Sequence, residues 1–289
     1  MRTLFSMSRP LLALSLIVSA AAVTAQAPSA TAPFEPHVGQ AGKDVVWVPT
    51  SQALVNKMLD MAKVTPQDYV IDLGSGDGRT VIAAAKRGAR ALGIEYNPEM
   101  VELSKRNAAS AGVTDKATFT KADLYESDFS KATVITMFLL PEINLKLRPK
   151  ILDLKPGTRI VSNTFTMGDW AADETSSASE EGSEYYRTAL LWIVPAKVEG
   201  TWKLAQGELS LQQNFQMVSG TLKAGNKISP VTGKVRGNDI TFTAGGAEYS
   251  GRVNGNAIEG SVKSGGSANH WSAVRGARGA TAAPAAPAG

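Results

Sequence analysis

The sequence predicts an α/β fold whose mostly parallel sheet is followed by a small antiparallel all-β domain. From residue 45 to residue 196, apolar stretches of strand length alternate with good helix formers, which is the pattern of repeated βαβ units. A glycine-rich turn follows the first of these strands. From residue 197 to residue 275 the apolar residues alternate in twos, and Gly and Asn turns separate the short strands. We therefore expect two folded domains, residues 45–196 and residues 197–275.

The glycine-rich turn has the composition of a nucleotide-binding loop. Residues 69–73 form a short apolar run that is typical of a buried parallel strand. Gly74, Gly76 and Gly78 follow at alternate positions, where a sharp turn close to a ligand requires residues without a Cβ atom. Residues 80–87 are good helix formers, so the free amide groups at the start of that helix would face the ligand.

The residues around the loop indicate which nucleotide it binds. The dinucleotide fingerprint requires a third glycine where this chain has Arg79. Asp72 lies two residues before the first glycine, where a carboxylate would repel a pyrophosphate but attract a ligand with ammonium and sulfonium groups. The next strand, residues 90–95, ends in Glu95, whose carboxylate can accept both hydroxyl groups of a ribose. The glycines alone could form only a tight turn between a strand and a helix. Together with Asp72 and Glu95, they predict a binding site for S-adenosyl-L-methionine (SAM).

The motif DLGSGDGR of residues 72–79, preceded by Val48-Pro49-Thr50, resembles a known family. It is similar to the class I methyltransferases that modify lysine on the mitochondrial ATP synthase c subunit and on the adenine nucleotide translocase, and to their bacterial relatives. A more distant similarity is to the non-SET histone lysine methyltransferases. The resemblance covers residues 45–195. It implies a Rossmann-like class I methyltransferase sheet, SAM as the cofactor and a protein lysine as the methyl acceptor.

The motif and the resemblance together imply a set of cofactor-binding residues. In this fold the acid after the third strand, here Asp123 behind residues 117–121, usually meets the amino group of adenine; a surface carboxylate without a role is the alternative. Thr50 or Ser51 would cap a helix that runs to about Lys63 and that closes over the methionine end of the cofactor in the resembled family. The expected cofactor-binding residues are Thr50, Asp72, Gly74, Ser75, Gly76, Asp77, Gly78, Glu95, Asp123 and Leu124.

The fourth strand, residues 133–138, ends in a sequence that bears on the methyl acceptor. Many amino methyltransferases carry N/D-P-P-Y there to hold a planar amide or a nucleobase amine, whereas this chain has F-L-L-P-E. The departure disfavours adenine or glutamine as the acceptor and favours an apolar slot for an alkyl amine. The expected slot residues are Phe138, Leu139, Leu140 and Pro141. Glu142 is the candidate catalytic base, or else only a partner of the positive end of the helix that Pro141 begins.

Capping residues and apolar runs predict the remaining elements of the first domain. Residues 97–99 are Asn-Pro-Glu, which is typical of a helix start, and this helix should run to about Ser110. Further strands are expected at residues 159–165 and 185–194. Residues 171–182 are acidic, rich in serine and without period, so we expect a mobile loop there.

Composition and charge limit the classes of function. The chain has 289 residues, a formal net charge of +4 and no cysteine, so disulfides and thiolate chemistry are excluded. Residues 28–195 carry 18 basic and 21 acidic residues, and a mildly acidic catalytic part argues against a nucleic acid partner, which would require a basic face. Two histidines, His37 and His270, are too few for a histidine metal cluster, so we expect no metal site.

The two ends of the chain predict export and flexible segments. Residues 1–27 combine two arginines, an apolar centre and a final A-x-A, which is typical of a cleaved signal peptide. The apolar centre is shorter than the roughly 20 residues that a membrane span requires, so we expect no stable membrane span once the signal peptide is cleaved. The alternative is that residues 1–27 remain attached as an uncleaved anchor. Residues 28–44 should form a linker and residues 276–289 a disordered tail. The mature protein would be periplasmic or secreted, which is in tension with the cytosolic source of SAM.

The leading hypothesis from these observations is a SAM-dependent methyltransferase that acts on the amine of a protein lysine. The first alternative is a small-molecule methyltransferase whose all-β domain forms part of the substrate pocket. The second is an exported, non-catalytic binding protein with a vestigial SAM fold. The residues predict neither the identity of the acceptor nor the oligomeric state.

Overall fold

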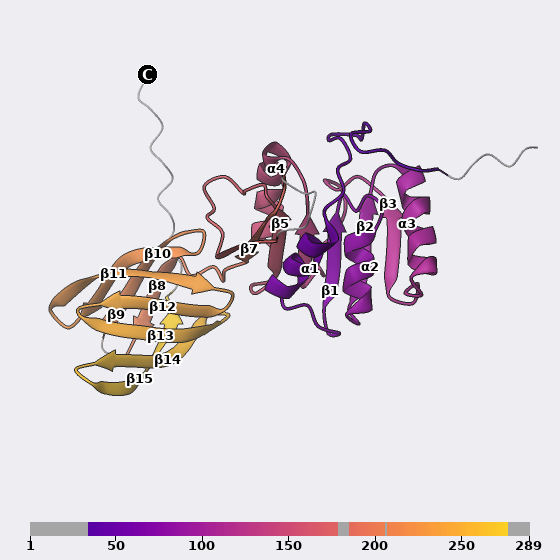
Figure 1. Cartoon of the computed structure of the whole chain (residues 1–289). Helices are drawn as coiled ribbons and strands as arrows, with labels where there is room; N and C mark the ends of the chain where they lie inside the picture. Colours follow the sequence, from indigo (N-terminus) through magenta and orange to yellow (C-terminus); the bar gives the residue numbers. More distant parts are fainter. Residues whose placement is uncertain (1–33, 179–184, 206, 277–289) are drawn as a thin grey trace, which may run out of the picture. The chain divides into compact units, whose positions relative to one another are not determined.

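The computed structural model describes residues 34–178, 185–205 and 207–276. The predicted signal peptide lies outside these residues, as do residues 28–33 of the expected linker and residues 277–289 of the expected tail. Within the described residues the chain forms a seven-stranded mixed sheet with helices and then a closed antiparallel barrel (Figure 1). The predicted fold class, a Rossmann-like class I methyltransferase sheet followed by an antiparallel all-β domain, is confirmed.

The sheet brings the carboxyl ends of its parallel strands to one edge. Its strands are β1 (Tyr69–Leu73), β2 (Arg90–Glu95), β3 (Ala117–Lys121), β4 (Val134–Met137), β5 (Arg159–Asn163), β6 (Glu174–Ser177) and β7 (Thr188–Ile193). They lie in the order β3-β2-β1-β4-β5-β7-β6, with β1 to β5 parallel and β7 antiparallel to both of its neighbours. The chain winds outward in one direction from β1 and then in the other from β4. In an open sheet of this kind the crevice beyond β1 and β4 is where ligands bind.

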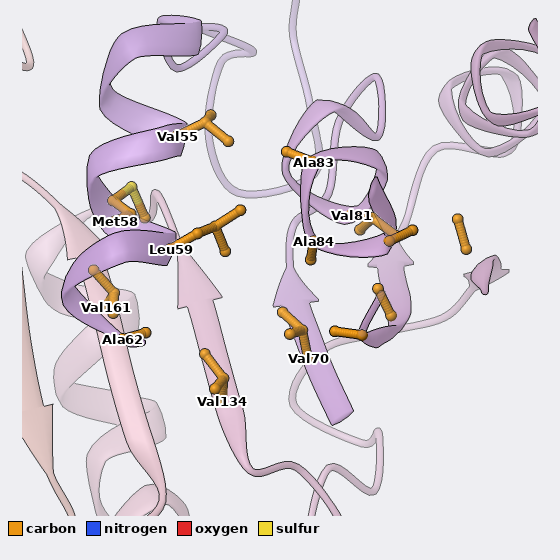
Figure 2. Packing of buried hydrophobic residues seen from close by; sticks show 14 of the residues in the cluster. Val55, Met58, Leu59, Ala62, Val70, Val81, Ala83, Ala84, Val134 and Val161 are labelled. Atoms are coloured by element: carbon orange, nitrogen blue, oxygen red, sulfur yellow. The ribbon is translucent and has the colours of Figure 1, made fainter. Parts of the chain in front are cut away.

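Helices cover both faces of the sheet. They are α1 (Gln52–Met61), α2 (Arg79–Lys86), α3 (Pro98–Ser110) and α4 (Pro141–Leu152). Figure 2 shows side chains of α1 and α2 directed toward Val70, Val134 and Val161 on β1, β4 and β5, and all of them are buried in one cluster. Helix α4 packs on the opposite face, where Leu147 and Ile151 join the other buried faces of the same strands. Burial on both faces explains why these strands are almost continuously apolar.

Capping residues start the helices where the sequence predicts. Ser51, the second of the two expected caps, accepts a hydrogen bond from the backbone of Leu54 at 3.3 Å. The side chain of Asn97 likewise caps α3, with the amide of Glu99 donating at 2.8 Å. Pro141 begins α4, since a proline at the first helical position loses no hydrogen bond.

Part of the acidic, serine-rich run of residues 171–182 differs from the expected mobile loop, and residues 179–182 lie outside the described residues. Residues 174–177 of this run form β6, an edge strand that pairs with β7. The carboxylate of Asp173 accepts a hydrogen bond from the backbone of Ile193 at 2.8 Å, which fixes the start of the pairing. The sequence did not reveal this strand because an edge strand with both faces near solvent carries no alternation of apolar and polar residues.

The all-β domain that the sequence predicts is a closed barrel. Its strands are β8 (Gly200–Leu204), β9 (Gly207–Asn214), β10 (Met217–Ala224), β11 (Lys227–Arg236), β12 (Asp239–Ala244), β13 (Ala247–Asn254), β14 (Ala257–Ser264) and β15 (Ser267–Arg275). Aromatic rings fill part of the interior, with Phe242 stacked on Tyr249 at 4.6 Å and Trp271 edge-on to both. A Cβ atom at Gly251 would lie 2.9 Å from the Trp271 ring, so the glycine leaves room for the ring.

Gly93 on β2 packs closely beneath the glycine-rich loop, and a substitution there tests this packing. A Cβ atom at Gly93 would lie 2.5 Å from the Ser75 hydroxyl and 2.7 Å from both the Ser75 Cβ atom and the Phe119 ring. We expect Gly93→Ala to lower the free energy of unfolding by about 1–3 kcal/mol through overpacking. Chemical denaturation measures it, with Thr120→Ala on exposed β3 as a control that should change stability by less than about 0.5 kcal/mol. Equal stabilities for the two variants would contradict this packing.

Candidate cofactor and acceptor site

A single cleft lies at the carboxyl ends of the parallel strands. Loops after β1 to β5 line it together with residues 40–50 from the N-terminal side. The predicted residues that line it are Thr50, Asp72, Gly74, Ser75, Gly76, Asp77, Glu95, Asp123, Leu124, Phe138, Leu139 and Leu140. The cleft therefore brings together the two ends of the site that the sequence predicts, one beside the glycine-rich loop and one beside the end of β4.

Three of the predicted site residues do not line the cleft. Gly78 caps α2 with a positive φ of 82°, and a Cβ atom there would lie 2.8 Å from Phe119, so its place is structural. Pro141 is the first residue of α4. Glu142, in the first turn of that helix, is exposed and outside the cleft, so the geometry gives no support to its prediction as a catalytic base.

The glycine-rich loop forms a cradle from backbone atoms. Gly74 and Gly76 have φ values of 77° and 54°, in the left-handed region that favours glycine. A Cβ atom at Gly76 would lie 2.6 Å from Nε1 of Trp47, so only glycine lets this indole approach the loop. The Ser104 hydroxyl donates to the carbonyl of Gly76 at 2.8 Å and holds the cradle against α3.

Asp72 presents a buried carboxyl group to the cleft. Its nearest donor is neutral, because the Thr136 hydroxyl on β4 donates to its Oδ1 at 2.6 Å. Burial raises the pKa of Asp72 to about 7, and the negative charges of Glu95 and Asp77 act in the same direction against the lowering effect of the Thr136 hydrogen bond. A carboxyl group in these surroundings would be stabilised in its ionised form by a bound cation.

Glu95 is positioned by two backbone amides. Gly76 donates to its Oε2 and Asn97 to its Oε1, both at 2.9 Å. Each carboxylate oxygen has a second lone pair, so two further donors can be accepted from the cleft. This geometry suits the neighbouring hydroxyl groups of a ribose.

Asp77 and Thr50 are tied to a residue that the sequence analysis did not assign to the site. Arg79 binds the Asp77 carboxylate through a salt bridge of 2.6 Å and donates to the carbonyl of Thr50 at 2.8 Å. It thus joins the glycine-rich loop to the start of α1. The arginine replaces the third glycine of the dinucleotide fingerprint, and this substitution is the signal that could have identified its role.

The C-terminal end of the expected linker folds against the cleft. Gly39 and Gln40 exchange backbone hydrogen bonds of 2.9 Å with Trp47, which closes a turn around residues 41–46. At its tip, Lys43 forms a salt bridge with Asp123 and lies 4.8 Å from the centre of the Tyr96 ring. The acid expected to meet adenine is therefore engaged by a lysine from this turn. The turn is too short to show a hydrophobic period in the sequence.

The acceptor end of the cleft is apolar and contains aromatic residues that the sequence analysis missed. Phe138, from the end of β4, contacts Phe165 and Tyr186 from segments that flank β5 and β7. Leu139 is almost fully buried and packs 3.1 Å from the place of a Cβ atom on Gly74. Phe165 follows the fifth strand directly, so its position at a strand's carboxyl end was the available signal.

The residues present fit SAM. A backbone cradle that a Cβ atom would fill, a buried carboxyl group for the cationic end and a second carboxylate with free lone pairs for the ribose all line one cleft. Among the described residues, no group of three or more His, Asp or Glu side chains could hold a metal ion. In the same part of the chain, no helix is long and apolar enough to cross a membrane.

We expect SAM to bind less tightly as the pH falls through about 7, because protonation of Asp72 removes the charge that faces the cation. The affinity should fall by up to about tenfold per pH unit below that value. Asp72→Asn should bind weakly throughout and lose the dependence, as measured by calorimetry between about pH 6 and pH 7.5. Glu102→Gln removes an exposed carboxylate paired with Lys105 and should behave as the wild type. Unchanged affinity in Asp72→Asn would exclude this role.

The same carboxyl group should make the cofactor-free protein less stable at neutral pH. Because the folded-state pKa of Asp72 lies above its unfolded value, ionisation is easier in the unfolded chain, and stability is lost as the pH rises from about 4 to about 7. Asp72→Asn should therefore melt at a higher temperature than the wild type at pH 8, with the difference shrinking toward pH 4. Thermal denaturation without SAM measures this, and a lower melting temperature of the variant at pH 8 would refute it.

Comparisons with known proteins agree with this site. The sequence model of a family described as "ANTKMT methyltransferase domain" matches residues 72–174. A protein-lysine N-methyltransferase of Saccharolobus islandicus is 42% identical over 153 residues, which cover 52% of this chain and 94% of the relative. A lysine N-methyltransferase of the ATP synthase c subunit, from Mus musculus, is 35% identical, and the match covers 45% of this chain but only 53% of that relative.

A solved structure is also similar, that of an RNA methyltransferase from Salinibacter ruber in complex with S-adenosyl-L-homocysteine. It is 46% identical, the match covers 52% of this chain and 96% of that one, and the TM-score is 0.48. The residues matched by the family model include the glycine-rich loop, Asp72 and Glu95, and the relative from Saccharolobus islandicus is matched over nearly its whole length. The chain therefore belongs to the family of SAM-dependent methyltransferases that includes the protein-lysine N-methyltransferase of Saccharolobus islandicus.

Proposed function

We propose that this enzyme transfers the methyl group of SAM to the side-chain amine of a protein lysine. The observation that carries the proposal is the chemistry of the acceptor end of the cleft, which Phe138, Leu139, Ile143, Phe165 and Tyr186 line. An aliphatic amine with a long apolar stem fits such a surface better than a planar amide or a nucleobase, which would require matching polar groups. The relative from Saccharolobus islandicus, described as a protein-lysine N-methyltransferase, supports the same substrate class.

In this reaction the side chains chiefly bind and position the two substrates. Bound SAM would supply an electrophilic methyl group, which leaves sulfur as the lone pair of the acceptor nitrogen forms the new bond. Asp72 and Glu95 would hold the cofactor, and the acceptor slot would place the nitrogen in line at about 3–3.5 Å from the methyl carbon. The lysine must first lose its proton to solvent, and an apolar slot favours this loss because desolvation lowers the pKa of an amine. This account assigns no step to Glu142.

Export remains part of the proposal. We infer from residues 1–27 that the chain carries a cleaved signal and acts outside the cytosol. N-terminal sequencing of the protein from fractionated cells tests this, since an intact N-terminus in the cytosolic fraction would refute export. That result would leave the methyl-transfer proposal untouched.

Incubation of the purified protein with SAM that carries a labelled methyl group identifies the acceptor class. Protein, RNA and small-molecule fractions of a cell extract are offered separately, and we expect label in the protein fraction on lysine, located by mass spectrometry of peptides. Asp72→Asn should transfer at least about tenfold less label at saturating protein and fixed low SAM, and a heat-treated sample should transfer none. Label confined to RNA or to small molecules would contradict the lysine proposal while leaving the enzyme class intact.

A further inference from the structure

Three aromatic rings form a wall at the acceptor end of the cleft. The ring centres of Phe138 and Phe165 lie 5.8 Å apart, and Tyr186 lies 5.1 Å from the first and 5.9 Å from the second. All three line the same cleft as Asp72 and the glycine-rich loop. Phe138 and Phe165 are half-buried, whereas Tyr186 is 42% exposed, so ring faces and edges remain open to a ligand.

The backbone that carries Phe165 is strained and held in place. Thr164 has a φ of 61°, which is rare for a β-branched residue, and the amide of Phe165 donates to the carbonyl of Asn163 at 2.6 Å across a tight turn. Strain of this kind persists only where the surroundings over-determine it, and it gathers at ligand sites.

Several side chains fix that turn. The Ser162 hydroxyl donates to the carbonyl of Phe165 at 2.7 Å, and the buried amide of Asn144 on α4 donates to the same carbonyl at 3.3 Å. The amide of Asn163 in turn donates to the hydroxyl of Thr50 at 3.1 Å, on the cofactor side of the cleft. The backbone that carries Phe165 is thus held by contacts with β5, with α4 and, through Asn163, with Thr50. A side chain needed only to fill the core would not require a strained backbone.

We propose that Phe138, Phe165 and Tyr186 form a subsite for a methylated alkylammonium group, which holds the acceptor side chain after methyl transfer to its neutral amine has made it a cation. Aromatic faces attract cations through their quadrupole, and a methylated ammonium is weakly hydrated, so it can leave water for such a surface at small cost. The inference deepens the proposed function, on which it rests, because it names the group of the acceptor that the cleft recognises. The wall consists of three aromatic rings, so we expect cation–π attraction to contribute to the recognition of charge.

A pair of matched probes tests this subsite without knowledge of the protein substrate. Nα-acetyl-Nε-trimethyllysine amide carries the cation, and its carbon analogue replaces the trimethylammonium group with a neutral tert-butyl group of nearly the same shape. Calorimetry of each probe with the full-length protein, saturated with S-adenosyl-L-homocysteine, measures the ratio of their affinities. We expect the cation to bind about five- to thirtyfold more tightly. Equal affinities, or no binding of either probe, would overturn the subsite.

Variants then locate the effect. Phe165→Leu and Tyr186→Leu keep apolar volume but remove a ring, and each should bring the ratio of affinities toward one, whereas Phe165→Tyr should preserve it. Tyr96→Leu removes a ring at the cofactor end of the same cleft and should leave the ratio unchanged. Retained affinity for S-adenosyl-L-homocysteine shows that Phe165→Leu and Tyr186→Leu remain folded. A ratio that persists in both would refute the assignment. The probe ratio is independent of the transfer assay, so failure of the lysine proposal and failure of the subsite give different results.

Discussion

The site depends on a carboxyl group that is buried beside other negative charges and that has no positive partner among the residues that the structure describes. Asp72 is almost fully buried, its hydrogen-bond donor is the neutral Thr136, and Glu95 and Asp77 add to the cost of its ionisation. Burial of an unpaired charge is among the most expensive features a fold can contain. The cofactor SAM carries positive charge on its ammonium and sulfonium groups, which this carboxylate would attract. The buried charge of Asp72 thus lowers the stability of the free protein, and the same charge would strengthen the binding of SAM.

The topology of the sheet explains why one cleft can serve both substrates. The carboxyl ends of β1 and β2 supply the glycine-rich loop and Glu95, and the carboxyl ends of β4 and β5 supply Phe138 and the strained turn before Phe165. Because β1 and β4 are neighbours at the point where the chain reverses its winding, these two groups of loops meet. Close contacts on β2, where Gly93 leaves no space for a Cβ atom, hold the loop against the sheet.

Much of the fold was predictable because local signals agreed with the tertiary context. The bounds of β1, β2 and β3 matched their apolar runs, and Asn97 and Pro141 marked helix starts, since caps and prolines act within a few residues. Edge strand β6 was missed because no apolar face marks it. Contacts between distant segments were beyond reach because they form only after the sheet has assembled, as between Lys43 and Asp123 or between Tyr186 and Phe138. The residues at one end of the cleft lie in or near one short motif, whereas those at the other end come from separate loops, which no motif marks.

The most direct test of the central claim is the titration of the Asp72 carboxyl group itself. Carbon-13 NMR of side-chain carboxyl groups, assigned with Asp72→Asn, reports its pKa with and without a saturating concentration of SAM. The account predicts a value near 7 in the free protein and a fall of at least about one pH unit on binding, because a cation stabilises the ionised form. A carboxyl group that titrates near 4 in the free protein, or whose pKa does not move when SAM binds, would contradict it.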